Sequence, residues 1–421
     1  MSKLYDENSI ESLNPLQFTR LRPGVYAGDC TYSTQLLVEI FSNAVDEYNA
    51  GNGSQIEVII NGDIVTVKDH GQGFIPNSFR DDGKTILEAA FSVLNTSGKY
   101  REDGSYEGTS LGSFGIGSKI TTFLSHWLEV TTFRDGKSEY IRFNEGVFES
   151  RKSNDKTPNS NGTIVKWQPS EEFFTHTEVE IEKIKSLFKT ISCLCPGLVI
   201  ELNDNGRKIV YKSENGLNDL ADDAIKDKEI ISNRLIINEQ NGKNRLNLVM
   251  TYTSNYSSTI VPYINTGLTD TGSHITQLKT TLTREMNKFF REKKWLKEKD
   301  ENLTGDDIQE GLYVVFNYTA PNVAYDAQVK SRITKIDTKF EITTFTSALQ
   351  NWLSRNEKEV KEIADKALSA RKAREAAKKA RDAARNAEKK KKEKVVKFDT
   401  KLADCYSKDR AKCEIYITEG K

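Results

Sequence analysis

The chain has 421 residues, 37% of them hydrophobic, which is enough for the buried cores of two or three domains. Its 61 Lys and Arg residues balance 61 Asp and Glu residues, so any contact with nucleic acid must come from a local basic patch. No apolar run is long enough to cross a bilayer, and the start lacks the basic-then-apolar pattern of a signal peptide. We therefore expect a cytoplasmic protein.

The five cysteines include no CxxC pair, and no histidine stands at zinc spacing from any of them. Cys193 and Cys195 are flanked by apolar residues, so we expect them to pack in a core rather than to hold a metal. The four histidines are scattered along the chain, and no Ser-His-Asp pattern is visible.

The first strong signal is a helix that begins near residue 36. Glu39, Asn43 and Asp46 fall together on one face of it. The neighbouring face is apolar and should be buried, through Leu37, Ile40, Phe41, Ala44 and Val45. Two strands should follow, at residues 56–60 and 64–67, joined by a tight turn at residues 61–63.

The second of these strands ends in the sequence DHGQG at residues 69–73. A carboxylate at Glu39 could activate water, while the amide oxygen of Asn43 could bind Mg²⁺ on a phosphate. Asp69 could accept a hydrogen bond from the amine of adenine, and the glycines would let the backbone approach the base. The alternative is a solvated helix face followed by an ordinary loop.

A helix at residues 85–94 leads into a polar, glycine-containing stretch from residue 98 to residue 110. This stretch could be a lid over a nucleotide or a plain surface loop. The glycine cluster at residues 112–117 then runs into a second helix, whose free backbone N–H groups would favour phosphate.

The three blocks E-x3-N, D-x-G-x-G and G-x2-G-x-G, in this order, resemble those of the Bergerat-fold ATPases, the GHKL group of gyrases, chaperones, histidine kinases and MutL-type proteins. The resemblance implies an α+β sandwich that uses ATP and Mg²⁺. The motif RPGVYAG at residues 22–28 looks like that of the gyrase B family, in which an N-terminal arm reaches the partner's nucleotide. The alternative for this segment is a frayed terminus and a turn.

Alternating residues predict strands at 127–143 and 162–167, a helix at 179–194 and a closing hairpin at 198–211, so that the ATPase domain spans residues 1–215. A second domain should span residues 216–395. Its predicted elements are strands at 234–237, 246–252 and 258–264, a helix at 275–290 and a strand at 311–318, joined by a crossover connection.

Two short motifs in the second domain, GSHI at residues 272–275 and AQVK at residues 327–330, resemble the pair that marks the transducer of type IIA topoisomerases. Gln328 and Lys330 would then contact the γ-phosphate. The alternative for the second motif is a solvated loop.

Residues 340–394 predict one long helix, and between Lys366 and Lys397 fourteen Lys or Arg residues face four Asp or Glu residues. This run is either a solvated surface or a surface that contacts DNA phosphates without reading sequence. Residues 396–421 resemble the linker and first strand of a TOPRIM domain, in which Glu419 would match an Mg²⁺-binding acid of the complete domain. We expect that the sequence is a truncated piece of a longer subunit.

The resemblance implies two catalytic residues, Glu39 as the base and Lys330 as the γ-phosphate sensor. The residues implied at the nucleotide are Tyr5, Asn43, Asp46, Asp69, Gly71, Gly73, Lys99, Tyr106, Gly112, Ser113, Phe114, Gly115, Ile116, Gly117, Ser118, Lys119, Gln328 and Lys330. Two features depart from the bacterial pattern. Gln72 replaces an arginine that would pair with Glu47, and Lys119 after the phosphate loop is similar to eukaryotic and viral enzymes, which points to a phage or divergent source.

The hypothesis is an ATP-operated gate of a type IIA topoisomerase, of the gyrase B or topoisomerase IV ParE kind. ATP would drive homodimerisation and capture of double-stranded DNA, and a subunit of the gyrase A or ParC type would cleave DNA. A non-topoisomerase GHKL clamp, MutL-like or chaperone-like, is the alternative, and a catalytically silent DNA-binding relative is a third. The sequence leaves open whether the parent enzyme supercoils, relaxes or decatenates DNA.

Overall fold

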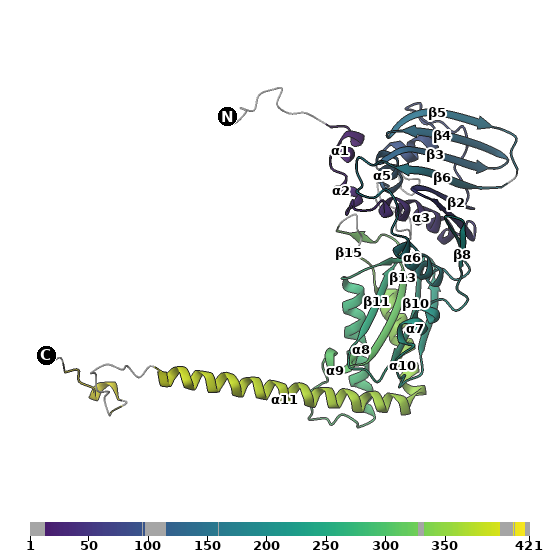
Figure 1. Ribbon diagram of the computed structural model, residues 1–421. Helices are drawn as coiled ribbons and strands as arrows, with labels where there is room; N and C mark the ends of the chain where they lie inside the picture. Colours follow the sequence, from purple (N-terminus) through teal and green to yellow (C-terminus); the bar gives the residue numbers. More distant parts are fainter. Residues whose placement is uncertain are drawn as a thin grey trace.

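The computed structural model describes residues 13–94, 96, 115–158, 160–326, 332–395, 407 and 409–416. Two β-sheets, one above the other in Figure 1, organise this part of the chain. No helix within the described residues is long and apolar enough to cross a membrane. The predicted α+β class is confirmed by this arrangement of sheets and covering helices.

The first sheet has eight strands in the order β5-β4-β3-β6-β2-β1-β7-β8. All neighbouring pairs are antiparallel except β1 with β7. One face is buried, and side chains on the other reach solvent, as Ile59 does. The strands are β1 Gln55–Asn61, β2 Ile64–Asp69, β3 Ser125–Arg134, β4 Lys137–Asn144, β5 Val147–Asn154, β6 Gly162–Pro169, β7 Val199–Asp204 and β8 Arg207–Tyr211.

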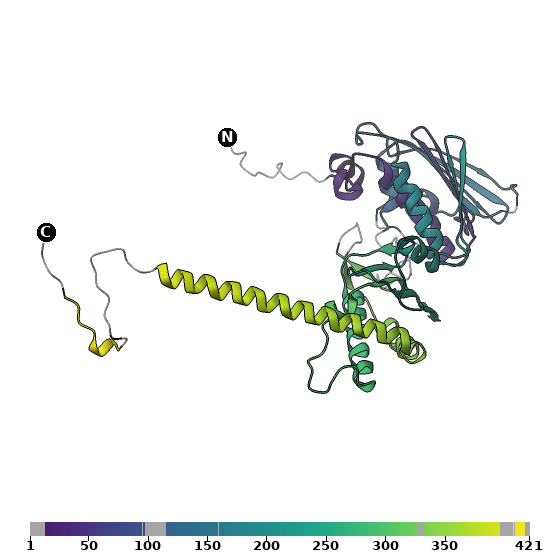
Figure 2. The ribbon, with the colours of Figure 1, turned by 60° about the horizontal axis from the view of Figure 1, so that its bottom comes forward.

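Helices pack on the buried face of this sheet, and α3 lies nearest its centre, against β2. The five apolar positions that the sequence assigned to the buried side of α3 are all buried. Figure 2 shows α3 and α6 side by side beneath the strands. The helices are α1 Pro15–Leu21, α2 Gly24–Ala27, α3 Thr34–Asn49, α4 Ile86–Ser92, α5 Gly117–Phe123 and α6 Ile181–Leu194.

The second sheet has five strands in the order β12-β11-β13-β10-β9, and its central strand β13 runs parallel to β11. The connection from β11 to β13 passes through α8, as the crossover prediction expected. The strands are β9 Leu235–Asn241, β10 Asn244–Tyr252, β11 Thr259–Ile264, β12 Gly267–Leu268 and β13 Leu312–Thr319. The accompanying helices are α7 Leu217–Ile225, α8 Ser273–Glu292, α9 Gly305–Gln309 and α10 Lys339–Arg355.

Strand β13 is buried on both faces and so joins the two halves of the molecule. Tyr313 and Val315 belong to the same buried cluster as α3, α6 and α7. The alternate residues Val314 and Phe316 belong to a second cluster, with α8 and α10. The predicted boundary at residue 215 falls between β8 and α7, and α7 covers the face of the second sheet that points toward the first domain.

The single helix predicted over residues 340–394 is wrong, because two helices meet at Asn356. That residue has φ −119° and ψ 41°, outside the helical region, and its side-chain amide donates to the carbonyl of Trp352. The break lets α10 pack along the second sheet while α11, Glu357–Val395, turns away and extends past the domain (Figures 1 and 2). The start of α11 is anchored by Val360, Ile363 and Ala364, which join the second core.

The turn between β11 and β12 is held in an uncommon backbone conformation. Asn265 and Thr266 have φ of 50° and 68°, a region that β-branched residues such as threonine rarely enter. The buried Asn265 side chain donates to the carbonyl of Ala320 at 3.0 Å and accepts from its N–H at 2.9 Å. Asn317 accepts a further hydrogen bond from the N–H of Thr266 at 3.2 Å. These contacts stabilise the turn at the edge of the second sheet.

We predict that Asn265→Gly lowers the free energy of unfolding by about 2–4 kcal/mol, because both buried backbone groups of Ala320 lose their partner. Glycine tolerates the positive φ, so the change isolates the hydrogen bonds. Asp135→Gly is the matched control, since Asp135 also has a positive φ, of 52°, but its side chain is exposed in a turn. Urea unfolding followed by tryptophan fluorescence measures both, and equal midpoints would contradict the role of Asn265.

Candidate functional site

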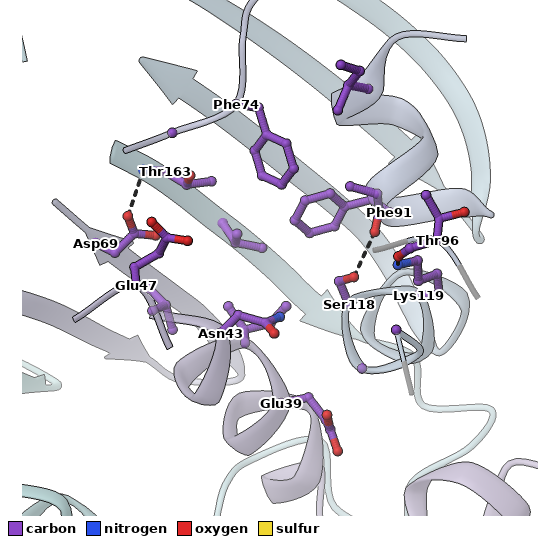
Figure 3. Close-up of a pocket in the computed structure, with 18 of the residues that line it drawn as sticks. Glu39, Asn43, Glu47, Asp69, Phe74, Phe91, Thr96, Ser118, Lys119 and Thr163 are labelled. Carbon is purple, nitrogen blue, oxygen red and sulfur yellow. Dashed lines mark hydrogen bonds between the residues drawn. The ribbon is translucent and has the colours of Figure 1, made fainter. Parts of the chain in front are cut away.

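A cavity of about 420 Å³ opens between α3, α4, the start of α5 and the strands β2 and β6. Figure 3 shows that its polar side chains come from elements far apart in the sequence. Glu39 and Asp69 lie at opposite ends, and Asn43 lies between them. The three chemical groups that the sequence singled out are therefore brought to one cavity.

Glu39 is 8% exposed and lies where α3 meets the first residue of α5. Its Oε1 accepts a hydrogen bond from Nε2 of Gln35, one turn earlier, at 2.8 Å. A Cβ atom at Gly117 would come within 2.2 Å of Oε2 of Glu39, so only glycine fits there. The carboxylate is thus held beside the backbone of the glycine-rich segment.

Asn43 and Glu47 continue the line of Glu39 along α3, each four residues further on, and both line the cavity. The prediction named Asp46 instead, and Asp46 is not among the lining residues. It is buried on another face of α3, where its carboxylate adds to the effect of burial in raising the pKa of Tyr325 in the second domain. Although Gln72 cannot pair with Glu47 as arginine would, its backbone N–H donates to Oε2 of Glu47 at 3.2 Å.

Asp69 ends β2 and presents its carboxyl to the cavity. Its Oδ1 accepts from the N–H of Gly71 at 2.8 Å and from the N–H of Thr163 at 3.2 Å. Both of these backbone donors reach Oδ1, so Oδ2 can accept from a ligand. Burial raises the pKa of Asp69 to about 6, against the opposing effect of the N–H donor of Gly71.

Gly73 lines the cavity, whereas Gly71 is not among the lining residues and instead donates to Asp69. Gly73 has φ 68°, and a Cβ atom there would lie 2.3 Å from the carbonyl oxygen of Phe133. Glycine is therefore required by the close approach of two strands of the protein itself, a reason that differs from the one expected from the sequence.

Gly115, Ile116, Gly117, Ser118 and Lys119 all line the cavity, at the end opposite Asp69. The hydroxyl of Ser118 donates to the carbonyl of Ala90 at 2.7 Å, which ties α5 to α4. Lys119 is buried and its Nζ donates to the carbonyl of Thr96 at 2.8 Å; burial lowers its pKa to about 8. Lys119 thus ties the start of α5 to the chain that follows α4.

The sequence motifs did not reveal an apolar wall of this cavity. Phe74 and Phe91 line it, with their ring centroids 6.4 Å apart and an edge-to-face arrangement. The N–H of Phe74 donates to the hydroxyl of Thr132 at 2.8 Å, so the backbone that carries this ring is held in place. The phenylalanine between Gly73 and Ile75 in the sequence was the available signal for this wall.

Several predicted site residues lie outside the described residues: Tyr5, Lys99, Tyr106, Gly112, Ser113, Phe114, Gln328, Lys330 and Glu419. The flanks of the AQVK segment are described. They form a hairpin of β14 Ala324–Tyr325 with β15 Ile333–Lys335, and Arg332 bridges to Thr271 just before α8. These flanks are therefore anchored to the helix start that carries the GSHI motif.

The buried His274 of that motif orients the loop before α8. Its Nε2 lies 2.9 Å from the hydroxyl of Thr269, and burial lowers its pKa to about 4, so the ring is neutral. Cys193 and Cys195 are buried, as expected, and burial raises the pKa of Cys195 to about 12. Within the described residues, no group of three or more His, Cys, Asp or Glu side chains could hold a metal.

We predict that Asp69→Asn makes the protein more stable at pH 8, by about 2–3 kcal/mol. The folded chain holds the Asp69 proton up to about pH 6, whereas the unfolded chain releases it near its ordinary value of 3.8. The unfolding free energy of the wild type therefore falls as pH rises from about 4 to 6, and asparagine removes this loss.

Denaturant midpoints of wild type and variant between pH 5 and pH 8 measure this effect. The gain in stability should shrink toward acid pH. Asp135→Asn, in the exposed β3–β4 turn, is the control and should show no such trend. A gain from Asp69→Asn that is the same at every pH would contradict the prediction.

Comparison with known proteins places the chain in a family. Residues 216–383 match the family model described as DNA gyrase B. The chain is 33% identical to the gyrase B protein of Thermotoga maritima over 434 residues, which cover 99% of this chain and 67% of the relative. It is 35% identical to the corresponding protein of DNA topoisomerase 4 from Streptococcus pneumoniae, over 99% of this chain and 66% of the relative. The chain thus spans about two thirds of the length of these relatives.

Solved structures agree. The 43K ATPase domain of Thermus thermophilus gyrase B, in complex with an aminocoumarin, matches with a TM-score of 0.69 and 28% identity, over 87% of this chain and 98% of that one. The topoisomerase IV ATP-binding domain of Francisella tularensis matches with a TM-score of 0.72 and 25% identity, over 85% and 97%. These findings favour the topoisomerase hypothesis over the MutL-like or chaperone-like clamp. The chain belongs to the family of gyrase B and its topoisomerase IV counterpart, the ATPase subunits of type II DNA topoisomerases.

Proposed function

We propose that this chain binds and hydrolyses ATP in the cavity between α3 and α5, and that it forms the ATP-operated gate of a type IIA topoisomerase. The observation that carries the proposal is the convergence of Glu39, Asn43 and Asp69 on one cavity, with glycine-rich backbone at the end near Glu39. The order of the three groups fits a nucleotide lying along α3. Its base would reach Asp69 and its phosphates would lie beside Gly117.

At the base end, Oδ2 of Asp69 would accept a hydrogen bond from the exocyclic amine of adenine. The two N–H donors at Oδ1 fix the carboxyl, so little side-chain entropy would be lost on binding. Phe74 and Phe91 offer an apolar surface to the ring of the base. Guanine carries a carbonyl oxygen where adenine carries its amine, so a carboxylate at this point favours adenine.

At the phosphate end, the backbone of residues 115–118 and the side chain of Asn43 line the cavity. Mg²⁺ fits this donor set, because it prefers oxygen ligands and is often held by one or two protein groups together with substrate phosphates. Asn43 would hold the ion, which would neutralise phosphate charge when bound. Glu39 would take the proton from the attacking water, a role that its position beside Gly117 supports.

The second domain would report the γ-phosphate through Gln328 and Lys330. The described flanks of this segment support the proposal, because Tyr325 lies close enough to Asp46 of α3 for the carboxylate to affect its pKa. Binding of ATP would then draw the second domain onto the first and drive homodimerisation, with Tyr5 of one chain at the nucleotide of the other. Lys99 and Tyr106 would belong to a lid.

Helix α11 would contact the captured double-stranded DNA. Its residues 372–388 are exposed and carry six Lys or Arg residues. Arg374 is partly neutralised by Asp307 of α9, with hydrogen bonds of 3.0 and 2.9 Å, which fixes the direction in which α11 leaves the domain. A subunit of the gyrase A or ParC type would cleave the DNA, and Glu419 would bind Mg²⁺ in the complete TOPRIM domain. A cytoplasmic location fits this role.

We predict that Glu39→Ala abolishes ATP turnover but keeps ADP affinity within about twofold, because a general base acts on the chemical step and contributes about 10²–10⁴-fold. Asn43→Ala should instead raise the Mg²⁺ concentration needed for nucleotide binding. A coupled ATPase assay and ADP titration calorimetry separate the two effects. Wild-type turnover by Glu39→Ala would exclude Glu39 as the base, and Glu88→Ala, on α4 outside the cavity lining, controls for loss of a buried carboxylate.

We predict that Lys330→Ala impairs both ATP hydrolysis and dimerisation driven by a non-hydrolysable ATP analogue, while ADP binding stays near normal. A charge-assisted contact with the γ-phosphate exceeds the roughly 0–1 kcal/mol of an exposed pair, and ADP lacks that phosphate. Lys335→Ala, in β15 of the same hairpin, is the matched control and should behave like wild type. Light scattering with analogue, ADP or no nucleotide measures the dimer. Equal hydrolysis by the two variants would remove Lys330 from the mechanism.

A further inference from the structure

A second cavity, of about 530 Å³, lies between the two domains. Its walls come from α2, α3 and α6 of the first domain and from the β11–β12 turn of the second. It meets α3 on a different face from the nucleotide cavity, because it touches Val38, Phe41 and Ser42 rather than Asn43 and Glu47. Among the described residues, Glu39 is the one that the linings of these two cavities share.

The walls of this interdomain cavity are mainly apolar. Aromatic and aliphatic side chains line it from both domains: Tyr26, Val38, Phe41, Leu187, Tyr263 and Leu268. Leu268 is 55% exposed, although it is a large apolar residue beside a hollow that could cover it. A ligand with a flat hydrocarbon body would therefore remove apolar surface from water on both sides of the domain boundary.

The charged groups of the cavity favour a cation. Two carboxylates line it, Asp29 and Glu39, against one ammonium within the described residues, that of Lys183. Lys183 is already paired with Glu180 at 2.9 Å, and its side chain is 70% exposed. Charge complementarity is thus met by a molecule with one positive group directed at the carboxylates.

Asp29 is held ready for such a group. Its Oδ1 accepts from the N–H of Thr31 at 2.9 Å and from the hydroxyl of Thr31 at 2.6 Å, so Oδ2 can accept from a ligand. The hydroxyl of Thr31, and then its N–H, lower the pKa of Asp29. Gln35 likewise occupies Oε1 of Glu39 and leaves Oε2 to the other contacts of that carboxylate.

We propose that this interdomain cavity is a second small-molecule site, which binds a planar, mostly apolar molecule with a single positive charge, of the aryl amidine or arylalkylamine class. The site is independent of the nucleotide cavity but touches Glu39. An occupant would fix the β11–β12 turn, strained at Thr266, against α3 and α6. Its effect on hydrolysis rests on the proposed role of Glu39, whereas binding itself does not.

Benzamidine is the probe, with benzamide as its neutral analogue and benzoate as its anionic one. Ligand-observed NMR titrations on the full chain should show saturable benzamidine binding that is about tenfold tighter than that of benzamide, the size of one well-placed charge contact. Benzoate should not bind. Saturating ADP should leave benzamidine bound, since the two cavities are separate. Displacement by ADP, or equal binding of all three probes, would overturn the proposal.

Substitutions locate the site. Ser186→Trp, on the exposed surface of α6 and in the cavity lining, should fill the hollow and abolish binding. Glu182→Trp, one turn earlier on the same helix but outside the lining, is the matched control. Leu268→Trp fills the cavity from the second domain and tests it if the first variant fails to fold. Asp29→Asn should weaken benzamidine about tenfold without changing benzamide. Unchanged benzamidine binding in both filled variants would overturn the site.

Hydrolysis separates this inference from the proposed function. With saturating benzamidine, kcat for ATP should fall severalfold while ADP affinity stays the same, because the bound cation neutralises the carboxylate of Glu39. Binding that maps to the cavity with no change in kcat supports the site and contradicts the role of Glu39. A fall in kcat that persists in Ser186→Trp would mean that benzamidine acts elsewhere, and would overturn the inference.

Discussion

The close packing of α3 against the start of α5 is the contact on which both cavities depend. Glu39 fits there only because Gly117 has no side chain, and the contact fixes the distance between the helix and the glycine-rich backbone. Ile120 and Phe123 of α5 are buried behind it, so the helix cannot move away without exposing apolar surface. A rigid partition of this kind lets one carboxylate border two hollows with different chemistry.

The second constraint is the central strand of the second sheet. Because β13 is buried on both faces, the core of the first domain and the core of the second share one backbone. A shift of α7 or α6 against this strand would disturb both cores, which are close-packed and tolerate few intermediate arrangements. In such a structure a small change at the nucleotide can select between discrete orientations of the second domain. Asp46 and Tyr325 lie on either side of the boundary where such a change would pass.

Charge is distributed along the chain in a way that suits these parts. The net charge is zero, yet the exposed length of α11 is strongly basic, while carboxylates concentrate around the two cavities. Buried carboxyls are costly when ionised, and Asp69 carries that cost at the point where a ligand would bind. A site of this kind is less stable than the chain could be, and ligand binding offsets the difference.

The sequence by itself determined the local chemistry. Residues four apart on a helix share a face, so Glu39 and Asn43 could be paired from spacing alone, and the strand before Asp69 followed from its alternating pattern. The order of the motifs was enough to indicate the family. Most strands and helices of both domains could also be predicted, because each carries a clear period and a turn at its end.

Tertiary structure decided what depends on contacts between distant segments. Glu47 rather than Asp46 lines the nucleotide cavity, because the neighbouring strands select which side of α3 is covered. Phe91 and Thr163 reach the cavity from elements far along the chain, and no local pattern announces them. Asn356 ends a helix that its sequence would continue, since packing against the second sheet favours the bend. The interdomain cavity exists only because two separately folded surfaces meet without filling the space between them.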